Sequence, residues 1–380
     1  MIKNAIIYSG GEAAPSLPTQ GLFTWGGIMH GNGGVTIPLS VVDTGTDWDY
    51  VACGDQHSLG IKNGALYSWG YNLSGKTGLN TNVGYTIIPT QVGSETDWYL
   101  VSAGFDHSLG IRKTWNTDHY DYTLWSWGEG GLYATGQGST TDLTVPTQVG
   151  TDTDWEWISA GFQWGCAVKG GKLYTCGSNS AYRTGQNTTS GNTTTPTSYD
   201  DSTGWTMCSA GYQHGLGIKS GELWAWGESG QYRTGMNNQT DLAVPTQVGV
   251  ATNWSAVNAG NYHSAAINTS NELFSWGYNF SGRTGQGTTI GYTTVPTKIG
   301  SDTDWTSINC NGNISITGLI ENTYAIKAGK LMAVGLNSTM QCGQDISTTE
   351  FTTFQQIGDG TNYIDIAAGS GFGMAIRKNS

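Results

Sequence analysis

Short runs of alternating hydrophobic and polar residues recur along the whole chain, separated by stretches rich in Gly, Asn, Asp and Thr. Trp98-Tyr-Leu-Val-Ser-Ala and Leu223-Trp-Ala-Trp are typical runs. They are short and rich in β-branched and aromatic residues, which is the pattern of half-buried β-strands. The alternation within the runs excludes helical repeats, so the pattern predicts an all-β protein.

The runs belong to a unit that occurs seven times. Its copies begin at Trp48, Trp98, Trp155, Trp205, Trp254, Trp305 and Tyr363, with intervals of 50, 57, 50, 49, 51 and 58 residues. A period near 50 residues indicates a solenoid, a propeller or an array. Each unit reads as four strands, W-x-x-V-x-A-G, H-S-L-G-I-K, G-x-L-Y-S-W-G and P-T-Q-V-G. Four short strands per unit predict a seven-bladed β-propeller of four-stranded antiparallel blades.

The two ends of the chain supply complementary parts of one unit. The last copy stops after its second strand, Gly373–Lys378, and the missing third strand appears as Gly21–Gly26. We therefore expect one blade to be closed by both termini, which removes two open sheet edges. The predicted propeller spans residues 21–380, with repeats starting near 46, 96, 153, 203, 252, 302 and 361 and the last completed by 21–45. Residues 1–20 match no blade and are expected to form an arm or a rim segment.

The phrases G-x-L-x-x-W-G, P-x-x-V and A-G-x-x-H-S resemble the repeats of the regulator-of-chromosome-condensation family over residues 21–380. The resemblance implies a seven-bladed propeller with a split last blade. The family includes nucleotide-exchange proteins for small GTPases, a plant ultraviolet-B photoreceptor and a secreted inhibitor of β-lactamase. This sequence shows neither the basic tail of the nucleotide-exchange proteins nor the G-W-R-H-T phrase of the photoreceptor.

Composition narrows the function classes. The formal net charge of −12 argues against binding nucleic acid through its phosphates and against an anionic membrane surface. No stretch approaches the ~20 apolar residues of a membrane span, and the first residues do not read as a secretory signal. The six cysteines form no C-x-x-C pair and read as small buried side chains, not as disulfides or metal ligands.

Two insertions depart from the repeat and are candidate partner-binding loops. The first is an eight-residue excess in blade two, within residues 113–123, and the second lies in blade six, within residues 311–321. Aromatic residues dominate binding hot spots, so the first is expected to be either a long contact loop or an ordered protrusion without a partner. The candidate contact residues are Trp115, His119, Tyr120, Tyr122, Ile314, Ile316 and Leu319.

Several residues share one position in the repeat. Lys76, Arg183, Arg233 and Arg283 form a candidate basic ring, expected either to pair with nearby carboxylates and carbonyls or to meet an acidic partner. Residues expected to be structural are His57, His107, His214, His263, Trp69, Trp127, Trp226 and Trp276. Neighbouring blades are too far apart for these histidines to share one zinc ion. Calcium at the acidic turns Asp47, Asp97, Asp154 and Asp304 stays an open alternative.

No catalytic constellation stands out, and we expect a non-enzymatic scaffold without a cofactor. The low charge, the Gly/Thr/Asn/Ser-rich composition and the N-terminal arm favour a virion structural, decoration or adhesion protein of a bacteriophage. Its partners would be other virion subunits or a host receptor, with attachment through residues 1–20. The alternative is a cytoplasmic regulatory propeller, similar to an exchange factor or an inhibitor, that binds a protein partner.

Overall fold

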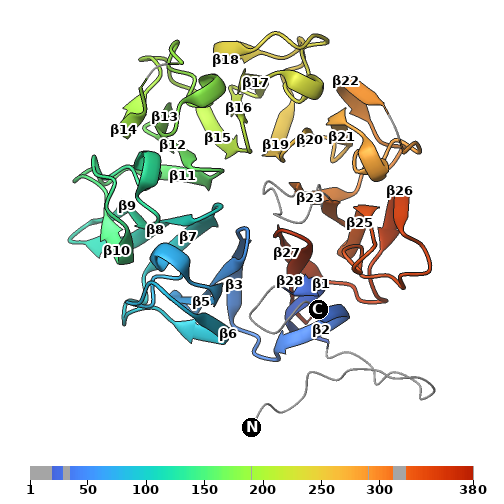
Figure 1. Ribbon diagram of the computed structural model, residues 1–380, viewed down its shortest axis with the longest axis horizontal. Helices are drawn as coiled ribbons and strands as arrows, with labels where there is room; N and C mark the ends of the chain where they lie inside the picture. The colour runs from blue at the N-terminus through green and yellow to red at the C-terminus, as the bar shows by residue number, and fades with distance from the viewer. Residues whose placement is uncertain (1–18, 29–34, 190, 290, 311–321, 380) are drawn as a thin grey trace.

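Seven antiparallel sheets surround a central axis in the computed structural model (Figure 1). The structure describes residues 19–28, 35–189, 191–289, 291–310 and 322–379. Each sheet has four strands, and the chain runs through each complete blade from the centre outward. The prediction of a seven-bladed propeller is confirmed.

The strands of blades one to three are β3 (Trp48–Cys53), β4 (His57–Lys62), β5 (Ala65–Tyr71), β6 (Tyr85–Gln91), β7 (Trp98–Ala103), β8 (His107–Asn116), β9 (His119–Gly128), β10 (Leu143–Gln148), β11 (Trp155–Ala160), β12 (Trp164–Lys169), β13 (Lys172–Gly177) and β14 (Thr193–Ser198). Those of blades four to six are β15 (Trp205–Ala210), β16 (His214–Lys219), β17 (Glu222–Gly227), β18 (Leu242–Gln247), β19 (Trp254–Ala259), β20 (His263–Asn268), β21 (Leu273–Tyr278), β22 (Tyr292–Lys298), β23 (Trp305–Cys310), β24 (Asn322–Lys327), β25 (Lys330–Leu336) and β26 (Glu350–Gln356). Single 3₁₀ turns follow five third strands, namely η1 (Leu73–Gly75), η2 (Gly131–Tyr133), η3 (Ser180–Tyr182), η4 (Gly230–Tyr232) and η5 (Phe280–Gly282).

Blade seven combines the two ends of the chain. Its strands are β27 (Tyr363–Ala368), β28 (Phe372–Arg377), β1 (Gly21–Ile28) and β2 (Val35–Asp43), in the order β2-β1-β28-β27. β1 pairs antiparallel with β28, from Gly21 opposite Arg377 to Gly26 opposite Phe372. The blue and red ends of the chain therefore lie side by side in Figure 1. The predicted closure by both termini is confirmed, whereas residues 1–18 of the expected arm lie outside the described residues.

The hydrophobic core is divided among the seven interfaces between neighbouring blades. The aromatic residue that opens each inner strand packs against the preceding blade, as Trp98 does against Leu59 and Ile61 of blade one. A glycine in the second strand makes room for this ring, because a Cβ at Gly110 would lie 2.6 Å from Trp98. The glycine of the repeated phrase H-S-L-G-I-K thus lets this ring pack closely on the second strand, and blade three accommodates its ring with Ala167 at the same position.

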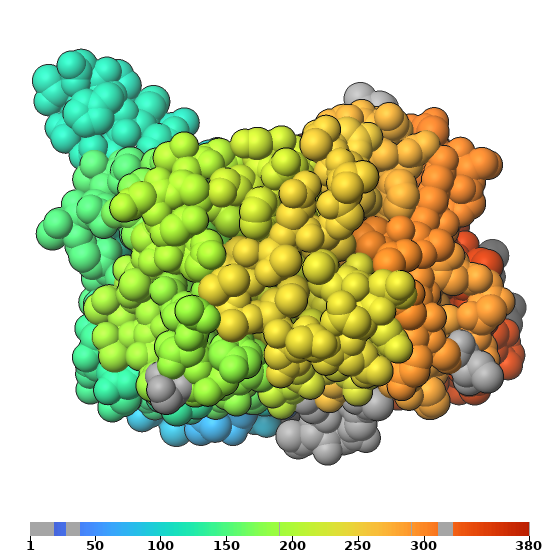
Figure 2. Space-filling model, turned by 90° about the horizontal axis from the view of Figure 1, so that it is seen from above, coloured from blue at the N-terminus to red at the C-terminus, as the bar shows by residue number. Residues whose placement is uncertain are grey.

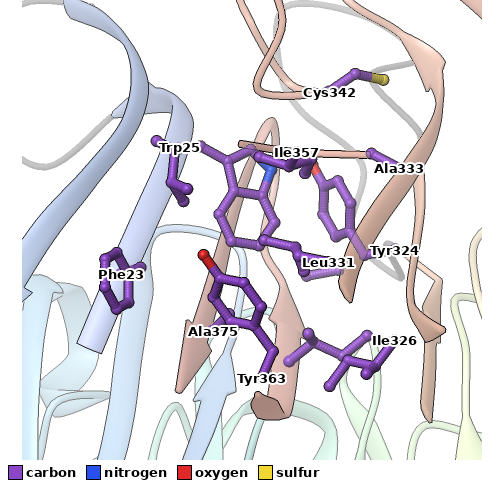
Figure 3. Close-up of a cluster of buried hydrophobic side chains, with 13 residues drawn as sticks. Phe23, Trp25, Tyr324, Ile326, Leu331, Ala333, Cys342, Ile357, Tyr363 and Ala375 are labelled. Carbon is purple, nitrogen blue, oxygen red and sulfur yellow. The ribbon is translucent and has the colours of Figure 1, made fainter. Parts of the chain in front are cut away.

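The closing blade has a core of its own against blade six (Figure 3). Trp25 lies edge-on to Tyr324 with ring centroids 5.1 Å apart, and Phe23 lies edge-on to Tyr363 at 5.9 Å. The indole of Trp25 also donates to the carbonyl of Gln341 at 2.9 Å. Because Trp25 is fully buried, its removal would cost about 3–5 kcal/mol of stability. The N-terminal strand therefore contributes core as well as ladder hydrogen bonds.

Side chains of the inner strands join consecutive blades from blade two to blade seven around a central cavity of about 130 Å³. The Oγ of Ser102 accepts from the backbone N–H of Ala160 in blade three at 2.9 Å. The other bonds of this set run from the side chains of Ser159, Ser209, Asn258 and Asn309 to the N–H groups of Ala210, Ala259, Cys310 and Ala368. Unpaired inner-edge N–H groups are thereby satisfied, which ties the blades into a ring.

Candidate functional site

The insertion of blade two is a β-hairpin, not the loop that we expected. The second and third strands of blade one end at Lys62 opposite Ala65, whereas β8 and β9 continue in register to Asn116 opposite His119. The extra residues pair along both strands, so they extend the sheet instead of leaving it. In Figure 2 this hairpin, coloured teal, projects beyond the rest of one face of the disc. We call that face the hairpin face.

One side of the hairpin is aromatic. Residues opposite each other in the ladder share a side, which places Lys113 with Tyr122 and Trp115 with Tyr120. Trp115 lies edge-on to Tyr120 at 4.8 Å, and their exposed fractions are 59% and 47%. Tyr99 of β7, 46% exposed, lies edge-on to Tyr122 at 5.5 Å. Four aromatic rings therefore form one accessible surface, which we call the aromatic face of the hairpin.

Lys113 holds three of these rings together. Its Nζ lies 4.3 Å from the ring centroid of Tyr120, 5.5 Å from that of Tyr99 and 5.6 Å from that of Tyr122. A hydrogen bond with Tyr122 raises the pKa of the Lys113 ammonium, so the cation persists over a wide pH range. Cation–π contacts at exposed sites contribute about 0.5–1 kcal/mol each. The rings are consequently ordered without a partner.

The opposite side of the hairpin is polar and paired within itself. Asp121 accepts from the amide of Asn116 at 2.8 Å and lies 3.1 Å from Nε2 of His119. His119 also bonds Asp118 at 2.7 Å, and this bond raises the pKa of the imidazole. Closer to the blade, Asp97 bonds Thr114 at 2.6 Å. Only the aromatic side thus presents a large apolar surface.

The base of the hairpin is fixed to blade three. The N–H of Tyr122 donates to the carbonyl of Thr153 at 2.8 Å, and Tyr122 forms a parallel bridge with Asp154. These contacts hold the hairpin upright over the interface between blades two and three. Trp115, His119, Tyr120 and Tyr122 are thus brought together on one element, although His119 lies on its polar side. Ile314, Ile316 and Leu319 lie outside the described residues.

The candidate basic ring is not an exposed surface. The exposed fractions of Lys76, Arg183, Arg233 and Arg283 are 1%, 4%, 1% and 0%. Lys76 pairs with Asp106 at 2.6 Å, and the guanidinium of Arg233 donates to the carbonyl of Asn261 at 3.1 Å. Buried cations need such partners because desolvation is costly. The expectation that these cations pair with nearby carboxylates and carbonyls describes their contacts. The other expectation, an exposed ring that meets an acidic partner, is wrong because the four side chains are buried.

The repeated histidines connect blades through hydroxyl groups. Nε2 of His57 lies 2.8 Å from Oγ of Ser108 in blade two, and that hydroxyl donates to the carbonyl of Lys76 at 2.9 Å. Since the hydroxyl proton is used on the carbonyl, the network assigns the imidazole proton to Nε2. His214 and His263 make the same bond, at 2.8 Å, to Ser264 and Thr323. These histidines therefore join neighbouring blades, and Trp69, Trp127, Trp226 and Trp276 are buried.

Sequence reasoning missed a second set of cations, on the hairpin face. A Lys or Arg near the end of a second strand covers the ring that opens the inner strand of its own blade, as Lys62 does over Trp48 at 5.4 Å. Lys62 also pairs with Asp43 at 2.8 Å. The same arrangement recurs in Arg112 with Asp97, Lys169 with Asp152 and Lys327 with Asp302. A basic residue five positions after H, in H-x-x-x-x-[KR], was the available signal.

The described residues contain no cluster of three or more His, Cys, Asp or Glu side chains suited to a metal ion. All six cysteines are free and buried, as expected for small apolar side chains. Burial also raises the pKa of the Cys176 thiol to about 12, so this group stays protonated. Within the described ranges, no helix is long and apolar enough to span a membrane.

These features define a seven-bladed β-propeller with a long β-hairpin added to blade two. Residues 254–283 match one profile of the regulator of chromosome condensation (RCC1) repeat, and residues 63–111 and 220–267 match a second. The family resemblance expected from the motifs is confirmed, because these segments match RCC1 repeats within a seven-bladed propeller. Its sequence matches no curated protein.

Solved structures share the architecture. Human WBSCR16 is 18% identical, with a TM-score of 0.79, over 95% of this chain and 99% of that chain. Yeast RCC1 (Prp20), solved bound to Kap60, is 15% identical with a TM-score of 0.79 over 100% and 97%. Prp20p of Saccharomyces cerevisiae, described with its binding to Gsp1p and histones, is 15% identical with a TM-score of 0.77 over 96% and 93%. At this identity the likeness establishes the fold.

Proposed function

We propose that this chain is a non-enzymatic, protein-binding propeller that recognises its partner with the aromatic face of the blade-two hairpin. The observation that carries the proposal is the ordered, exposed cluster of Trp115, Tyr120, Tyr122 and Tyr99 around Lys113. Trp and Tyr are the residues most enriched among binding hot spots. Rings that are already ordered lose little conformational entropy when a partner covers them.

The hairpin serves recognition better than stability. Trp115 and Tyr120 are exposed beyond the end of the blade, whereas Tyr122 packs against the hydrophobic cluster between blades two and three. An apolar surface that projects into solvent carries a solubility cost unless a partner uses it. The overall charge of −12 favours a partner whose contact surface is neutral or basic, and Lys113 sits within rings that such a surface would cover.

Two biological settings were expected from the sequence, a virion and a regulatory complex. The likeness to the yeast propeller that was solved with Kap60 supports the regulatory setting. The virion setting depends on residues 1–20 as an attachment arm, and residues 1–18 lie outside the described residues. We therefore propose a regulatory propeller that binds a protein, and keep virion attachment as the outcome to be tested against it.

The test is capture of the partner from the source culture with three versions of the full chain. The wild type is compared with the double variant Trp115→Ala/Tyr120→Ala and with Tyr292→Ala, which removes a 52% exposed aromatic ring from blade five. We expect the wild type and Tyr292→Ala to retain the same protein and the double variant to lose it. With the purified partner, hot-spot loss corresponds to a rise of at least ~30-fold in Kd.

The identity of the captured protein separates the two settings. A cellular protein retained through the hairpin supports the regulatory proposal, whereas a capsid or tail subunit supports the virion. Equal capture by all three versions contradicts the hairpin as the recognition surface. Thermal unfolding of each variant checks that the fold is intact, because none of the substituted side chains is buried.

A further inference from the structure

The cations that cover the inner tryptophans differ in the acceptor that they bond. In blades three, four and six a lysine bonds the residue three positions before the ring. These bonds are Lys169 to Asp152 at 2.7 Å, Lys219 to Ser202 at 2.7 Å and Lys327 to Asp302 at 2.6 Å. Blade two has an arginine instead, and Nε of Arg112 bonds Asp97, the residue directly before Trp98, at 2.7 Å. The acceptor three positions before Trp98 is therefore not used by its own blade.

That acceptor is Glu95, which occupies in blade two the position of Asp152 and Asp302. Its half-buried carboxylate accepts from the backbone N–H of Ser94 at 3.1 Å. Within the ranges that the structure describes, no basic side chain forms an ion pair with Glu95. Blade two thus keeps the carboxylate of the repeat and lacks the ammonium that meets it in blades three and six.

Glu95 lines a cleft at the rim between blades one and two. The cleft measures about 400 Å³, which is within the usual range for ligand sites. Leu79 of blade one and Val145 and Pro146 of blade two supply its apolar walls. The half-buried ring of Trp125 adds an aromatic wall. A ligand with an alkyl stem and a cationic end matches both the walls and the carboxylate.

The charges of the cleft favour a cation over an anion. Glu95 and Arg112 are the charged side chains among its lining residues. The charge of Arg112 is balanced by Asp97, and its guanidinium carbon lies 5.7 Å and 4.9 Å from the ring centroids of Trp98 and Trp125. Glu95 has no such counter-charge, so the cleft carries an excess of one negative charge. The net charge of −12 on the whole chain attracts cations in the same way.

We propose that this rim cleft binds a lysine side chain of a partner protein, with the ammonium on the carboxylate of Glu95 and the methylenes against the apolar walls. Lysine is inferred because it is the residue that meets the same carboxylate position in blades three and six. An ammonium donates three hydrogen bonds, and Asn80 and Gln91, which also line the cleft, carry further acceptor oxygens. Arg112 and Trp125 lie on the side of their strands opposite to the aromatic face, so the inference stands without the proposed function.

The probe is Nα-acetyl-lysine methylamide, titrated into the full chain while the indole N–H resonance of Trp125 is followed by NMR. We expect a saturable shift with a Kd on the order of 1 mM, as befits one side chain. The matched probe, in which the lysine Nε is acetylated as well, keeps the stem and lacks the charge, so it should bind at least ~5-fold more weakly. Equal shifts from both probes, or none from either, would overturn the proposal.

Substitution of the carboxylate provides the second test. Glu95→Gln keeps the size of the side chain and removes its charge, so we expect the lysine probe to bind ~5-fold more weakly. Glu156→Gln makes the same change at an exposed position of blade three and should leave the response at Trp125 unaltered. Unchanged binding in Glu95→Gln, or an equal loss in both variants, would refute the site. The double variant Trp115→Ala/Tyr120→Ala should bind the probe as the wild type does, which separates failure of the hairpin proposal from failure of this one.

Discussion

His107 faces Gly165 across the interface between blades two and three, and its Nε2 lies 4.0 Å from the position that a Cβ on Gly165 would take. In blades one, four and five the equivalent imidazole bonds a hydroxyl of the next blade at 2.8 Å. Glycine supplies no hydroxyl, so Nε2 of His107 is buried without a hydrogen-bond partner. Burial without compensation lowers the pKa of His107 to about 4.

Gly165→Ser is expected to stabilise the propeller by about 1 kcal/mol, because the new hydroxyl satisfies a buried nitrogen. The gain is limited by the new Cβ, which would lie 3.1 Å from Leu109. Chemical denaturation measures the change, and Gly215→Ser is the contrasting variant, since a Cβ there would lie 2.2 Å from Trp226. We expect that second substitution to destabilise. A loss of stability in Gly165→Ser of the same size would contradict the missing-hydroxyl explanation.

Asp365 provides a prediction on pH. Its carboxylate accepts from the N–H of Val51 at 2.9 Å and joins blade seven to blade one. Burial raises the pKa of Asp365 from 3.8 to about 7, against the lowering effect of its backbone hydrogen bonds. An acid with a raised pKa in the folded state binds a proton there that the unfolded chain has released. Its contribution to stability is therefore complete below pH ~4 and falls as the pH rises toward 7.

Asp365→Asn removes this dependence while keeping an oxygen for the N–H of Val51. The full effect of such a pKa change is about 4 kcal/mol, and because Asp365 is only half-buried we expect roughly 1–3 kcal/mol of it. We expect the free energy of unfolding of the variant to exceed that of the wild type at pH 8 by that amount and to equal it near pH 4. Unfolding by urea at both pH values provides the comparison. A constant difference between the two proteins would show that titration of Asp365 is not the cause.

The hairpin should be dispensable for folding. Replacing residues 113–122 by Asn-Gly joins Arg112 to Thr123 through the turn that blade one forms with Asn63 and Gly64. Both turn residues have positive φ, as a two-residue hairpin requires. We expect a cost of no more than about 1–2 kcal/mol, from the lost contact of Tyr122 with Thr153. Thermal unfolding gives the stability, and loss of the cooperative transition would mean that the hairpin is part of the core.

The sequence predicts the blades well, because each one repeats the same alternation and the same turn glycines. Contacts between blades are harder to predict from the sequence. The hydroxyl that His57 meets is Ser108, 51 residues away, and only the ring geometry brings the two together. The hairpin was predicted as a loop, since the alternation of Lys113–Tyr122 is polar on one side and aromatic on the other.

A last prediction concerns the ring of bonds around the central cavity. Ala52 occupies in blade one the position that Ser102 holds in blade two, so the interface between blades one and two lacks the bond from a side chain to an inner-edge N–H. Ala52→Ser is expected to accept from the N–H of Ala103, as Ser102 does from Ala160 at 2.9 Å. We expect a gain of about 0.5–1.5 kcal/mol in the free energy of unfolding.

Ser209→Ala is the reverse change at an intact position, because Oγ of Ser209 accepts from Ala259 at 2.9 Å. It should cost a similar amount, and slower hydrogen exchange at Ala103 in Ala52→Ser should accompany faster exchange at Ala259 in Ser209→Ala. The two exchange rates matter more than the stabilities, since a serine that merely fills space would change stability without protecting a particular amide. If Ala103 exchanges at the wild-type rate in Ala52→Ser, the side chain does not complete the ring.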